Sequence, residues 1–524
     1  VFTHPLLQGC VLVAVALAIA LWVEVPGRFP DPDSFYHAGM GELASQGKFP
    51  ARFPWLDLTV LRDQYADLHL VYHLILVPFV AVLGPMAGIR VATITAFVLL
   101  TLAFFLLLRS QKIRGALVWT LLLVGTASFA FRMNLAKSQG FALTVLFLGI
   151  LSLLQRSRTK TFLAAVFATW LSTAWPVYAL VVLVFGFHHI LATIIGAPRQ
   201  WHAVLRAVGD ALGLLISAAI GVAAGFIVNP YFPGNLTVAK QQIVDIALGA
   251  QRLGVVNGME WQALSTGDFV RAIGFLFPIL ALAVIGCTIR VIELIRNEKT
   301  DDRDAVAAML TFGVLSIAFA FLALASQRHL EFFVPFAVLF AATGCQPVLR
   351  WFWPPRIAVG WRRPGMIRRA LSTVGLLVAI AVFAVGSVRA LRMSRGYFVN
   401  GHPADYLRGT ATWIRDHAAP GAIVFHADWG DAPALFLWNR DQRYLIGLDP
   451  IFAALKDVEE YRTWLAVGRG ELGAQTVQTI RETFGADYAL VTAKQPDLDA
   501  ILTKDRKARL AHEDAGVKVY ELAR

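Results

Sequence analysis

The chain has 524 residues, of which 57% are hydrophobic and only 16% are charged, and its mean hydropathy is +0.61. These values exclude a soluble globular protein and predict a polytopic α-helical membrane protein embedded in a lipid bilayer. The net charge of +12 lies wholly before residue 389, because residues 389–524 hold 18 basic and 18 acidic side chains. The excess positive charge clusters between apolar segments, as in cytoplasmic loops, so it indicates membrane topology and no nucleic-acid partner.

Eleven apolar segments are predicted to cross the membrane, since with this number every basic loop falls on one side. They are residues 6–23, 87–108, 116–131, 141–154, 161–174, 177–195, 211–228, 269–289, 306–325, 334–349 and 370–388. The first is not followed by a small-residue cleavage site and is predicted to be an uncleaved anchor. Residues 68–83 are also apolar, but as a span they would place Arg109 and Lys112 outside, so a helix at the outer surface is predicted there.

After residue 388 the hydropathy drops, and short apolar runs alternate with amphipathic segments. The runs with the length of strands are Ala422–Phe425, Arg443–Leu448, Tyr488–Thr492 and Val517–Leu522. The segments with a helical pattern are Asp405–His417, Val458–Ala466 and Gly473–Phe484. This alternation predicts that residues 389–524 form a soluble extracytoplasmic α/β domain joined to a transmembrane domain of residues 1–388. The predicted location is the bacterial cytoplasmic membrane.

The candidate active site is the stretch Pro30–His37, which follows the first apolar segment and puts two carboxylates at a membrane surface. Because Asp31 precedes a proline, its backbone is expected to be extended, and residues i and i+2 of an extended chain point to the same side. Asp31 and Asp33 are therefore expected to share one small volume, with Tyr36 and His37 close behind. The alternative is a solvated turn that ends a helix, because Pro and Asp are ordinary loop residues.

A second polar group follows the first outer loop. His69 and His73 are four residues apart, so on a helix they share a face, and with Asp67 they are candidate metal ligands. Asp31, Asp33, Asp67 and His69 are the candidate ligands of a divalent cation, Mg²⁺ or Mn²⁺; the alternative is no metal, with Asp33, Asp67 and His69 orienting the acceptor. Alternatively, the histidines anchor a helix at the polar interface or bond to the neighbouring loop. The three cysteines fall inside apolar segments and have no metal-ligand spacing.

Arg328 lies between two predicted spans, in the stretch Ser326–Pro335. A charged residue so near hydrocarbon is costly and tends to have a partner or a function. The planar guanidinium is suited to bind a phosphate through two parallel hydrogen bonds. Alternatively, Arg328 is an interfacial arginine that extends its head toward water or pairs with Glu331.

These stretches resemble the GT-C superfamily of integral-membrane glycosyltransferases, and most of all the catalytic subunit of oligosaccharyltransferases. In that family an Asp-Pro-aromatic stretch with a following Tyr opens the first outer loop, and Asp31–His37, within the predicted outer loop 24–67, is similar to it. Arg328, with a proline seven residues on, is similar to the arginine that binds the donor phosphate. In the soluble domain Trp413 and the turn Asp428–Asp431 resemble, in order though only in part, the motif that reads an acceptor sequon.

The resemblance implies transfer of a sugar or glycan from a polyprenyl-phosphate or pyrophosphate donor to a glycan, lipid or protein acceptor. It implies Asp31 as the catalytic carboxylate, with Asp33 beside it, Arg328 at the donor phosphate and Trp429 near the acceptor. The second outer loop, residues 132–137, lacks the acidic pair that helps to hold the family's metal. Both metal dependence and a peptide acceptor therefore stay undecided at this point.

Two other classes of function compete with an enzyme. A transporter or flippase also has many spans and buried charges, and a non-catalytic subunit retains a glycosyltransferase scaffold without its chemistry. Transporters usually place polar residues near the middle of the bilayer, between two similar halves. Here the polar residues gather at one face and no two halves look alike, which favours the glycosyltransferase.

Overall fold

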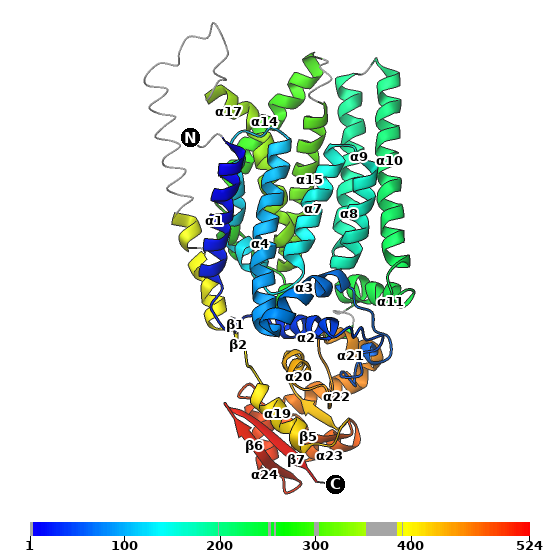
Figure 1. Cartoon of the computed structure of the whole chain (residues 1–524), viewed down its shortest axis with the longest axis vertical. Helices are drawn as coiled ribbons and strands as arrows, with labels where there is room; N and C mark the ends of the chain where they lie inside the picture. Colours follow the sequence, from blue (N-terminus) through cyan, green and yellow to red (C-terminus); the bar gives the residue numbers. More distant parts are fainter. Residues whose placement is uncertain are drawn as a thin grey trace.

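The computed structural model describes residues 4–197, 199–249, 253–255, 258–297, 303–352, 385–389 and 391–523. In this part of the chain a bundle of long helices carries a small α/β domain at one end (Figure 1). The chain is thus a multi-pass integral membrane protein with a C-terminal domain, which confirms the predicted fold class.

The long helices of the bundle suit a bilayer because a helix satisfies its backbone hydrogen bonds internally. They are α1 (Pro5–Val23), α4 (Pro85–Ser110), α7 (Gln139–Leu154), α8 (Arg158–Leu171), α9 (Trp175–Gly196), α10 (Trp201–Ile227), α14 (Leu276–Asn297), α15 (Arg303–Ala325) and α16 (Leu330–Gly344). Among the described residues, seven helices are long and apolar enough to cross a membrane. The number is eight if α5 (Ala116–Val124) and α6 (Ala127–Met133), which meet at an angle of 72°, form one bent span.

The predicted spans coincide with helices of the bundle, apart from residues 370–388, most of which lie outside the described residues. Helices α7 and α8 have 16 and 14 residues, so they are shorter than the ~20 residues that a perpendicular crossing needs. They nevertheless pack inside the bundle, α7 against α4 and α8 against α10 (Figure 1). The span predicted from residue 269 begins instead at Leu276, because the chain breaks at Gly274 after α13 (Thr266–Ile273).

Short helices cover the end of the bundle that faces the α/β domain (Figure 1). They are α2 (Asp33–Ser45), α3 (Leu70–Leu83) and α11 (Gly234–Lys240), with a π-helical stretch at Gln241–Gly249 and 3₁₀ turns at Val60–Arg62, Met259–Trp261 and Gln327–His329. The 14 residues of α3 reach only about 21 Å at 1.5 Å per residue, less than the ~30 Å hydrocarbon core. This helix lies across the bundle end, in agreement with the surface helix predicted for residues 68–83. At the far end of the bundle, α17 (Gln346–Phe352) follows α16.

The C-terminal domain is built on a five-stranded sheet in the order β4-β3-β5-β7-β6. The strands are β3 (Ile423–His426), β4 (Arg443–Tyr444), β5 (Ala486–Val491), β6 (Ala508–Asp514) and β7 (Val517–Leu522). The helices around them are α19 (Arg408–His417), α20 (Ala432–Trp438), α21 (Ile451–Lys456), α22 (Val458–Gly468), α23 (Thr476–Glu482) and α24 (Pro496–Lys504), with a 3₁₀ turn at Gly473–Gln475. The four predicted strands are all present. The edge strand β6 was not predicted, because its exposed, charged sequence carries no apolar run.

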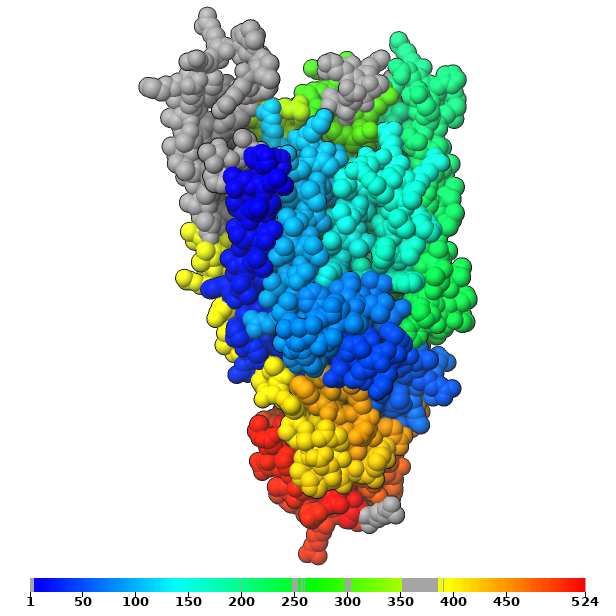
Figure 2. Space-filling model, viewed as in Figure 1, coloured from blue at the N-terminus to red at the C-terminus, as the bar shows by residue number. Residues whose placement is uncertain are grey.

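The first outer loop extends the sheet of this domain. Its residues run beside β4: the backbone N–H of Tyr444 donates to Trp55 at 2.8 Å, and that of Asp57 donates to Tyr444 at 2.7 Å. A second pairing joins β1 (Arg28–Phe29) to β2 (His402–Pro403) in an antiparallel ladder. Figure 2 shows the blue outer-loop segments seated directly on the yellow and orange segments of the domain. The loop and the domain therefore share one hydrophobic core and hold the site between them.

Candidate active site

Two carboxylates of the first outer loop converge on a single lysine. The ammonium of Lys137 lies 2.6 Å from Asp31 Oδ2 and 2.8 Å from Asp33 Oδ2. The lysine side chain is 8% exposed, whereas those of the two aspartates are 18% and 27% exposed. The predicted pairing of Asp31 and Asp33 in one small volume is therefore present, and the cation that joins them comes from the second outer loop.

The backbone brings the two carboxylates together by a different route from the predicted extended chain. Asp33 is the first residue of α2, and its N–H donates to Asp31 Oδ1 at 2.9 Å. The N–H of Ser34 donates to the carbonyl of Asp31 at 3.2 Å. Asp31 thus satisfies a free N–H at the helix start, and Asp33 lies at the positive end of the helix dipole. The turn into α2, rather than strand alternation, aims both side chains at Lys137.

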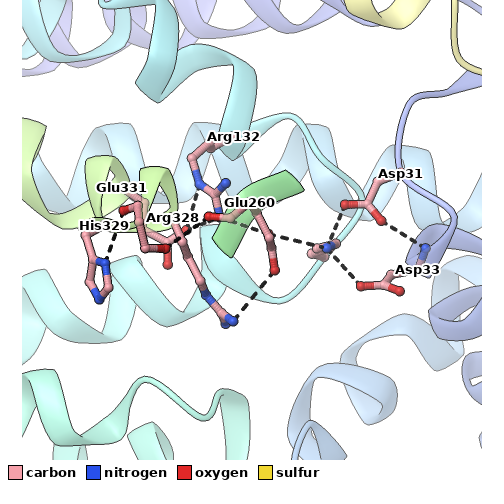
Figure 3. A network of polar contacts seen from close by, with 9 residues as sticks. Asp31, Asp33, Arg132, Glu260, Arg328, His329 and Glu331 are labelled. Atoms are coloured by element: carbon pink, nitrogen blue, oxygen red, sulfur yellow. Dashed lines mark hydrogen bonds and ion pairs between the residues drawn. The ribbon is translucent and has the colours of Figure 1, made fainter. Parts of the chain in front are cut away.

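A chain of ion pairs continues from Lys137 through Glu260 to Arg132, Arg328 and Glu331, and Figure 3 shows the last four side chains together. Glu260 lies 3.9 Å from Lys137, 3.4 Å from Arg132 and 3.7 Å from Arg328. Arg132 also donates from Nε and Nη2 to Glu331 Oε2, both at 3.0 Å. Glu331 therefore pairs with Arg132, so the suggested Arg328–Glu331 pair is not formed. Arg328 instead lies 4.8 Å from the ring centroid of Trp261.

The buried pair of Arg132 and Glu331 is expected to be important for stability. The two side chains are 9% and 2% exposed, and removal of one partner from a buried pair typically costs about 3–5 kcal/mol. Glu331→Gln should therefore lower the thermal unfolding midpoint of the detergent-purified protein by several degrees. The matched control is Glu459→Gln, since Glu459 is 75% exposed in its pair with Arg462 and should change the midpoint little. Equal midpoints for the two variants would contradict this assignment.

The network borders an open cavity with about 910 Å³ of empty space. The membrane part and the C-terminal domain both contribute to its wall. The polar side chains of the wall are Asp33, Tyr36, His37, Tyr65, His69, Lys137, Ser138, Gln139, Ser172, Thr173, Gln242, Glu260, Arg328 and Asp449. A carboxylate, an ammonium and a guanidinium thus face one volume, which is the arrangement expected where a charged substrate is bound.

Burial shifts the ionisation of the carboxyl groups around this cavity. It raises the pKa of Asp31 to about 6, although Lys137 acts in the opposite direction. It also raises the pKa of Asp449 to about 7. For Glu260 burial acts to raise the pKa, but Lys137 and Arg328 outweigh it and hold that pKa well below its ordinary value. Asp31 is therefore a carboxyl whose pKa lies near the pH at which a general base is effective.

The histidines form a second network, and two of them, His37 and His69, belong to the cavity wall. His37 Nδ1 and His73 Nε2 share a hydrogen bond of 2.8 Å, and His73 Nδ1 lies 2.6 Å from Asp67 Oδ2. His69 Nδ1 lies 3.0 Å from the carbonyl of Leu171, and the His69 N–H donates to Asp67 Oδ1 at 2.9 Å. These contacts tie α3 to α2 and to the end of α8. They match the alternative in which the histidines bond to neighbouring segments.

The predicted metal ligands do not come together. Asp31 and Asp33 face Lys137, whereas Asp67 and His69 belong to the histidine network. Within the described residues, no three His, Cys, Asp or Glu side chains form a group that suits a metal ion. The four residues predicted to bind Mg²⁺ or Mn²⁺ are thus divided between two networks. Two of them, Asp31 and Asp33, already pair with the ammonium of Lys137.

The remaining predicted residues lie beside the cavity or in its wall. The hydroxyls of Tyr36 and Tyr65 are 2.7 Å apart in the wall. Trp429 is not among the wall residues, but its ring lies 3.6 Å from where a Cβ would stand on Gly258. The turn that carries Trp429 therefore contacts the segment that holds Glu260.

Three site residues were missed by sequence reasoning: Lys137, Glu260 and Asp449. Residues 132–137 are basic and lack an acidic pair, and this local pattern does not indicate which carboxylates Lys137 contacts. Asp449 follows the predicted strand Arg443–Leu448 and precedes a proline, which is a usual position for a residue that begins a helix. Its Oδ1 accepts the N–H of Ile451 at 2.9 Å, at the start of α21. No local signal marks Glu260.

An apolar groove adjoins the cavity and runs into the bundle. It has about 430 Å³ of empty space, and it shares Gln139 and Ser172 with the cavity wall. The rest of its wall consists of Ala142, Leu143, Leu146, Ala168, Ala174, Trp175, Val177, Tyr178, Glu331 and Phe332. The groove thus leads from the charged cavity at the bundle end to a mostly apolar wall formed by residues of α7, α8, α9 and α16.

The fold of the chain, with its charged cavity at the bundle end, is similar to the fold of several solved glycosyltransferases. No family model matches the chain, and no curated relative matches it. The likeness is to solved structures, which agrees with the resemblance noted in the sequence.

The archaeal oligosaccharyltransferase AglB from Archaeoglobus fulgidus, solved with an inhibitory peptide and a dolichol-phosphate, has a TM-score of 0.65 and 12% identity over 98% of this chain and 74% of its own. The arabinofuranosyltransferase AftD from Mycobacteria has a TM-score of 0.57 and 14% identity over 98% of this chain and 40% of its own. ArnT from Cupriavidus metallidurans has a TM-score of 0.55 and 15% identity over 98% of this chain and 97% of its own. At these identities the likeness establishes the fold.

Proposed function

We propose that this protein is a membrane glycosyltransferase that moves a sugar or glycan from a polyprenyl-phosphate or pyrophosphate donor to an extracytoplasmic acceptor. The observation that carries the proposal is the cavity wall, where Asp33, Lys137 and Arg328 face one volume beside an apolar groove. A lipid-linked sugar has the matching parts: an acceptor-facing sugar, an anionic phosphate and a long apolar tail. The GT-C fold of the chain supports the same conclusion.

The chemistry needs a proton acceptor and a cation for the leaving phosphate. As the acceptor oxygen forms a bond to the anomeric carbon, its proton passes to Asp31. The bond between that carbon and the phosphate oxygen breaks, and its electron pair stays on the phosphate. Arg328 stabilises the charge that develops there, and Asp33, which faces the cavity, orients the acceptor. No redox partner is required.

The groove between α7, α8 and α9 is suited to hold the lipid tail of the donor. Its wall is largely apolar, and it meets the cavity at Gln139 and Ser172, at the bundle end that faces the C-terminal domain. A polyprenyl chain placed there would keep its phosphate at the level of Arg328. In AglB the solved complex contains a dolichol-phosphate, which is a donor-type lipid of the same chemistry.

The C-terminal domain is proposed to face the extracytoplasmic side and to contribute to acceptor binding. Asp449 and Phe452 from this domain line the cavity, and Trp429 packs against the segment next to it. We place residues 1–388 in the transmembrane part and residues 389–524 in this domain, in a bacterial cytoplasmic membrane. The acceptor is a glycan, a lipid or a protein.

The proposal is tested by sugar transfer in proteoliposomes that contain the purified protein. Labelled polyprenyl-phosphate and polyprenyl-pyrophosphate sugars are supplied with an acceptor extract, and transfer of the label is followed in the wild type and in Asp31→Asn. Transfer by the wild type alone supports the enzyme. Label that only crosses the bilayer, equally in both proteins, would instead identify a flippase, and the absence of both would identify a scaffold.

The rate of transfer should depend on pH through Asp31. A general base acts in its ionised form, so below the pKa of about 6 the rate should fall about tenfold per pH unit, and above it the rate should level off. The measurement is kcat/KM for the donor between about pH 4.5 and 8, in steps of about one pH unit. The same fall in rate at low pH should persist in Asp449→Asn. This variant removes the Asp449 carboxyl group, whose pKa is raised to about 7 in the wild type. If the rate of this variant no longer falls at low pH, the group that titrates is Asp449.

A further inference from the structure

Lys137 occupies the centre of the carboxylate cluster. Its ammonium lies 2.6 Å from Asp31, 2.8 Å from Asp33 and 3.9 Å from Glu260. The side chain is 8% exposed, and it is part of the cavity wall. A buried lysine in ion pairs with two carboxylates remains charged, because the paired charges compensate the cost of burial.

The second outer loop holds this lysine firmly in place. Asn134 donates from Nδ2 to the carbonyl of Ala130 at 2.7 Å, which ties the loop to the end of α6. Ser138 Oγ lies 3.2 Å from His69 Nδ1, which ties the other end to α3. The loop is therefore fixed on both sides of Lys137, and the ammonium is positioned before any substrate enters.

A divalent cation bridging the same carboxylates does not fit beside this ammonium. An ion such as Mg²⁺ needs carboxylate oxygens at about 2.0–2.1 Å, and the oxygens in question are those already directed at Lys137. A divalent ion in contact with Asp31 and Asp33 would also face the positive ammonium at close range, and like charges at that distance repel strongly. The residues present therefore suit a resident ammonium rather than a metal ion.

We propose that Lys137 takes the place of a divalent metal in this site, so that sugar transfer requires no metal. The inference rests on the proposed function and names the cation that this function uses. Lys137 is a positioning residue: it holds Asp31 and Asp33 in one orientation toward the acceptor.

The geometry also leaves the lysine able to meet the donor. An ammonium group has three N–H donors, of which two are directed at Asp31 and Asp33. In the described part of the chain the next carboxylate, Glu260, is 3.9 Å away, which is beyond hydrogen-bond distance. Lys137 thus keeps one N–H that neither Asp31 nor Asp33 accepts, and it lies in the same cavity wall as Arg328.

The test combines metal binding with transfer. Mn²⁺ binding to the purified full-length protein in nanodiscs is measured by electron paramagnetic resonance for the wild type, Lys137→Asp and Lys137→Met. The control is Lys518→Asp, because Lys518 also pairs with a carboxylate, Asp499, at 2.7 Å in the C-terminal domain. Transfer of the labelled sugar is measured for the same proteins with a chelator and with added Mn²⁺.

The wild type and Lys518→Asp should bind no Mn²⁺ at this site and should transfer at the same rate, within about twofold, with or without chelator. Lys137→Met should lose about 100-fold in transfer under every condition, as when a fixed donor to a charged group is removed. Lys137→Asp, which presents a third carboxylate, should bind one Mn²⁺ and transfer only when Mn²⁺ is present. A lysine that merely stabilises the fold would not produce this reversal of metal dependence.

Two results would overturn the inference. One is a wild-type rate that falls tenfold or more with chelator and returns with Mn²⁺. The other is one-to-one Mn²⁺ binding to the wild type that is lost in Asp33→Asn. Both use proteins with Lys137 intact, so they decide the question even if a Lys137 variant fails to fold. If the wild type transfers no sugar, the proposed function fails, and Mn²⁺ binding still tests the role of Lys137.

Discussion

Asp31→Asn should reduce sugar transfer by about 10²–10⁴-fold, the range expected for loss of a general base. The amide keeps the size of the side chain and its bond from the Asp33 N–H, but it cannot take up the acceptor's proton. The loss should appear in kcat, with little change in the KM for the donor, because in the proposed mechanism Asp31 acts on the acceptor and not on the donor. The measurement is the initial rate of transfer in proteoliposomes as a function of donor concentration.

Two variants of the same loop make this result specific. Asp63→Asn changes an exposed aspartate of the same outer loop and should leave the rate unchanged. Asp33→Asn should lower the rate by about tenfold and raise the KM for the acceptor, since Asp33 faces the cavity and orients the substrate. A full rate in Asp31→Asn together with a large loss in Asp33→Asn would exchange the roles of the two residues.

Arg328→Ala should lower kcat/KM for the donor by about 100-fold, because one preorganised cation for the leaving phosphate is lost. Arg328 is 22% exposed and faces the cavity from the turn before α16. Its ion pair with Glu260 is long, at 3.7 Å, so the guanidinium is not committed to a single partner. The measurement is the dependence of the transfer rate on donor concentration.

A lysine at the same position should recover only part of the loss, since an ammonium lacks the planar pair of donors that matches a phosphate. The matched control is Arg271→Ala, because Arg271 is 76% exposed and pairs with Asp268 away from the cavity. An unchanged donor KM and kcat in Arg328→Ala would mean that Arg328 only anchors the helix end through Trp261 and Glu260.

The agreement between sequence and structure is closest where the pattern is local. The spans follow from runs of apolar residues, and the strands β3, β5 and β7 follow from short apolar runs between polar segments. The surface helix α3 follows from charge bias alone, because a further span would have reversed the side of Arg109 and Lys112. Strand β6 was missed because its alternation is exposed and charged, so that only pairing with β7 stabilises it.

The candidate site shows where local reasoning ends. Asp31 and Asp33 are two residues apart, so their proximity was predictable, although the start of α2 rather than an extended chain produces it. The partner of Arg328 was not predictable from the sequence. Arg328 pairs with Glu260 and not with Glu331 because Arg132 already binds Glu331. Which side chains pair is thus decided by the packing of different loops against one another.

The sequence by itself determined the class of membrane protein, the positions of the apolar helices though not the number of spans, the α/β nature of the C-terminal domain and the pair of aspartates at the bundle end. Each of these depends on composition or on neighbours within a few turns of chain. Only the tertiary structure decided that Lys137, Glu260 and Asp449 complete the cavity. These residues lie more than 100 positions apart, and the free energy that joins them comes from burial of the loops against one another. An ion pair between distant segments leaves no periodic signal in the sequence, so only the folded chain shows it.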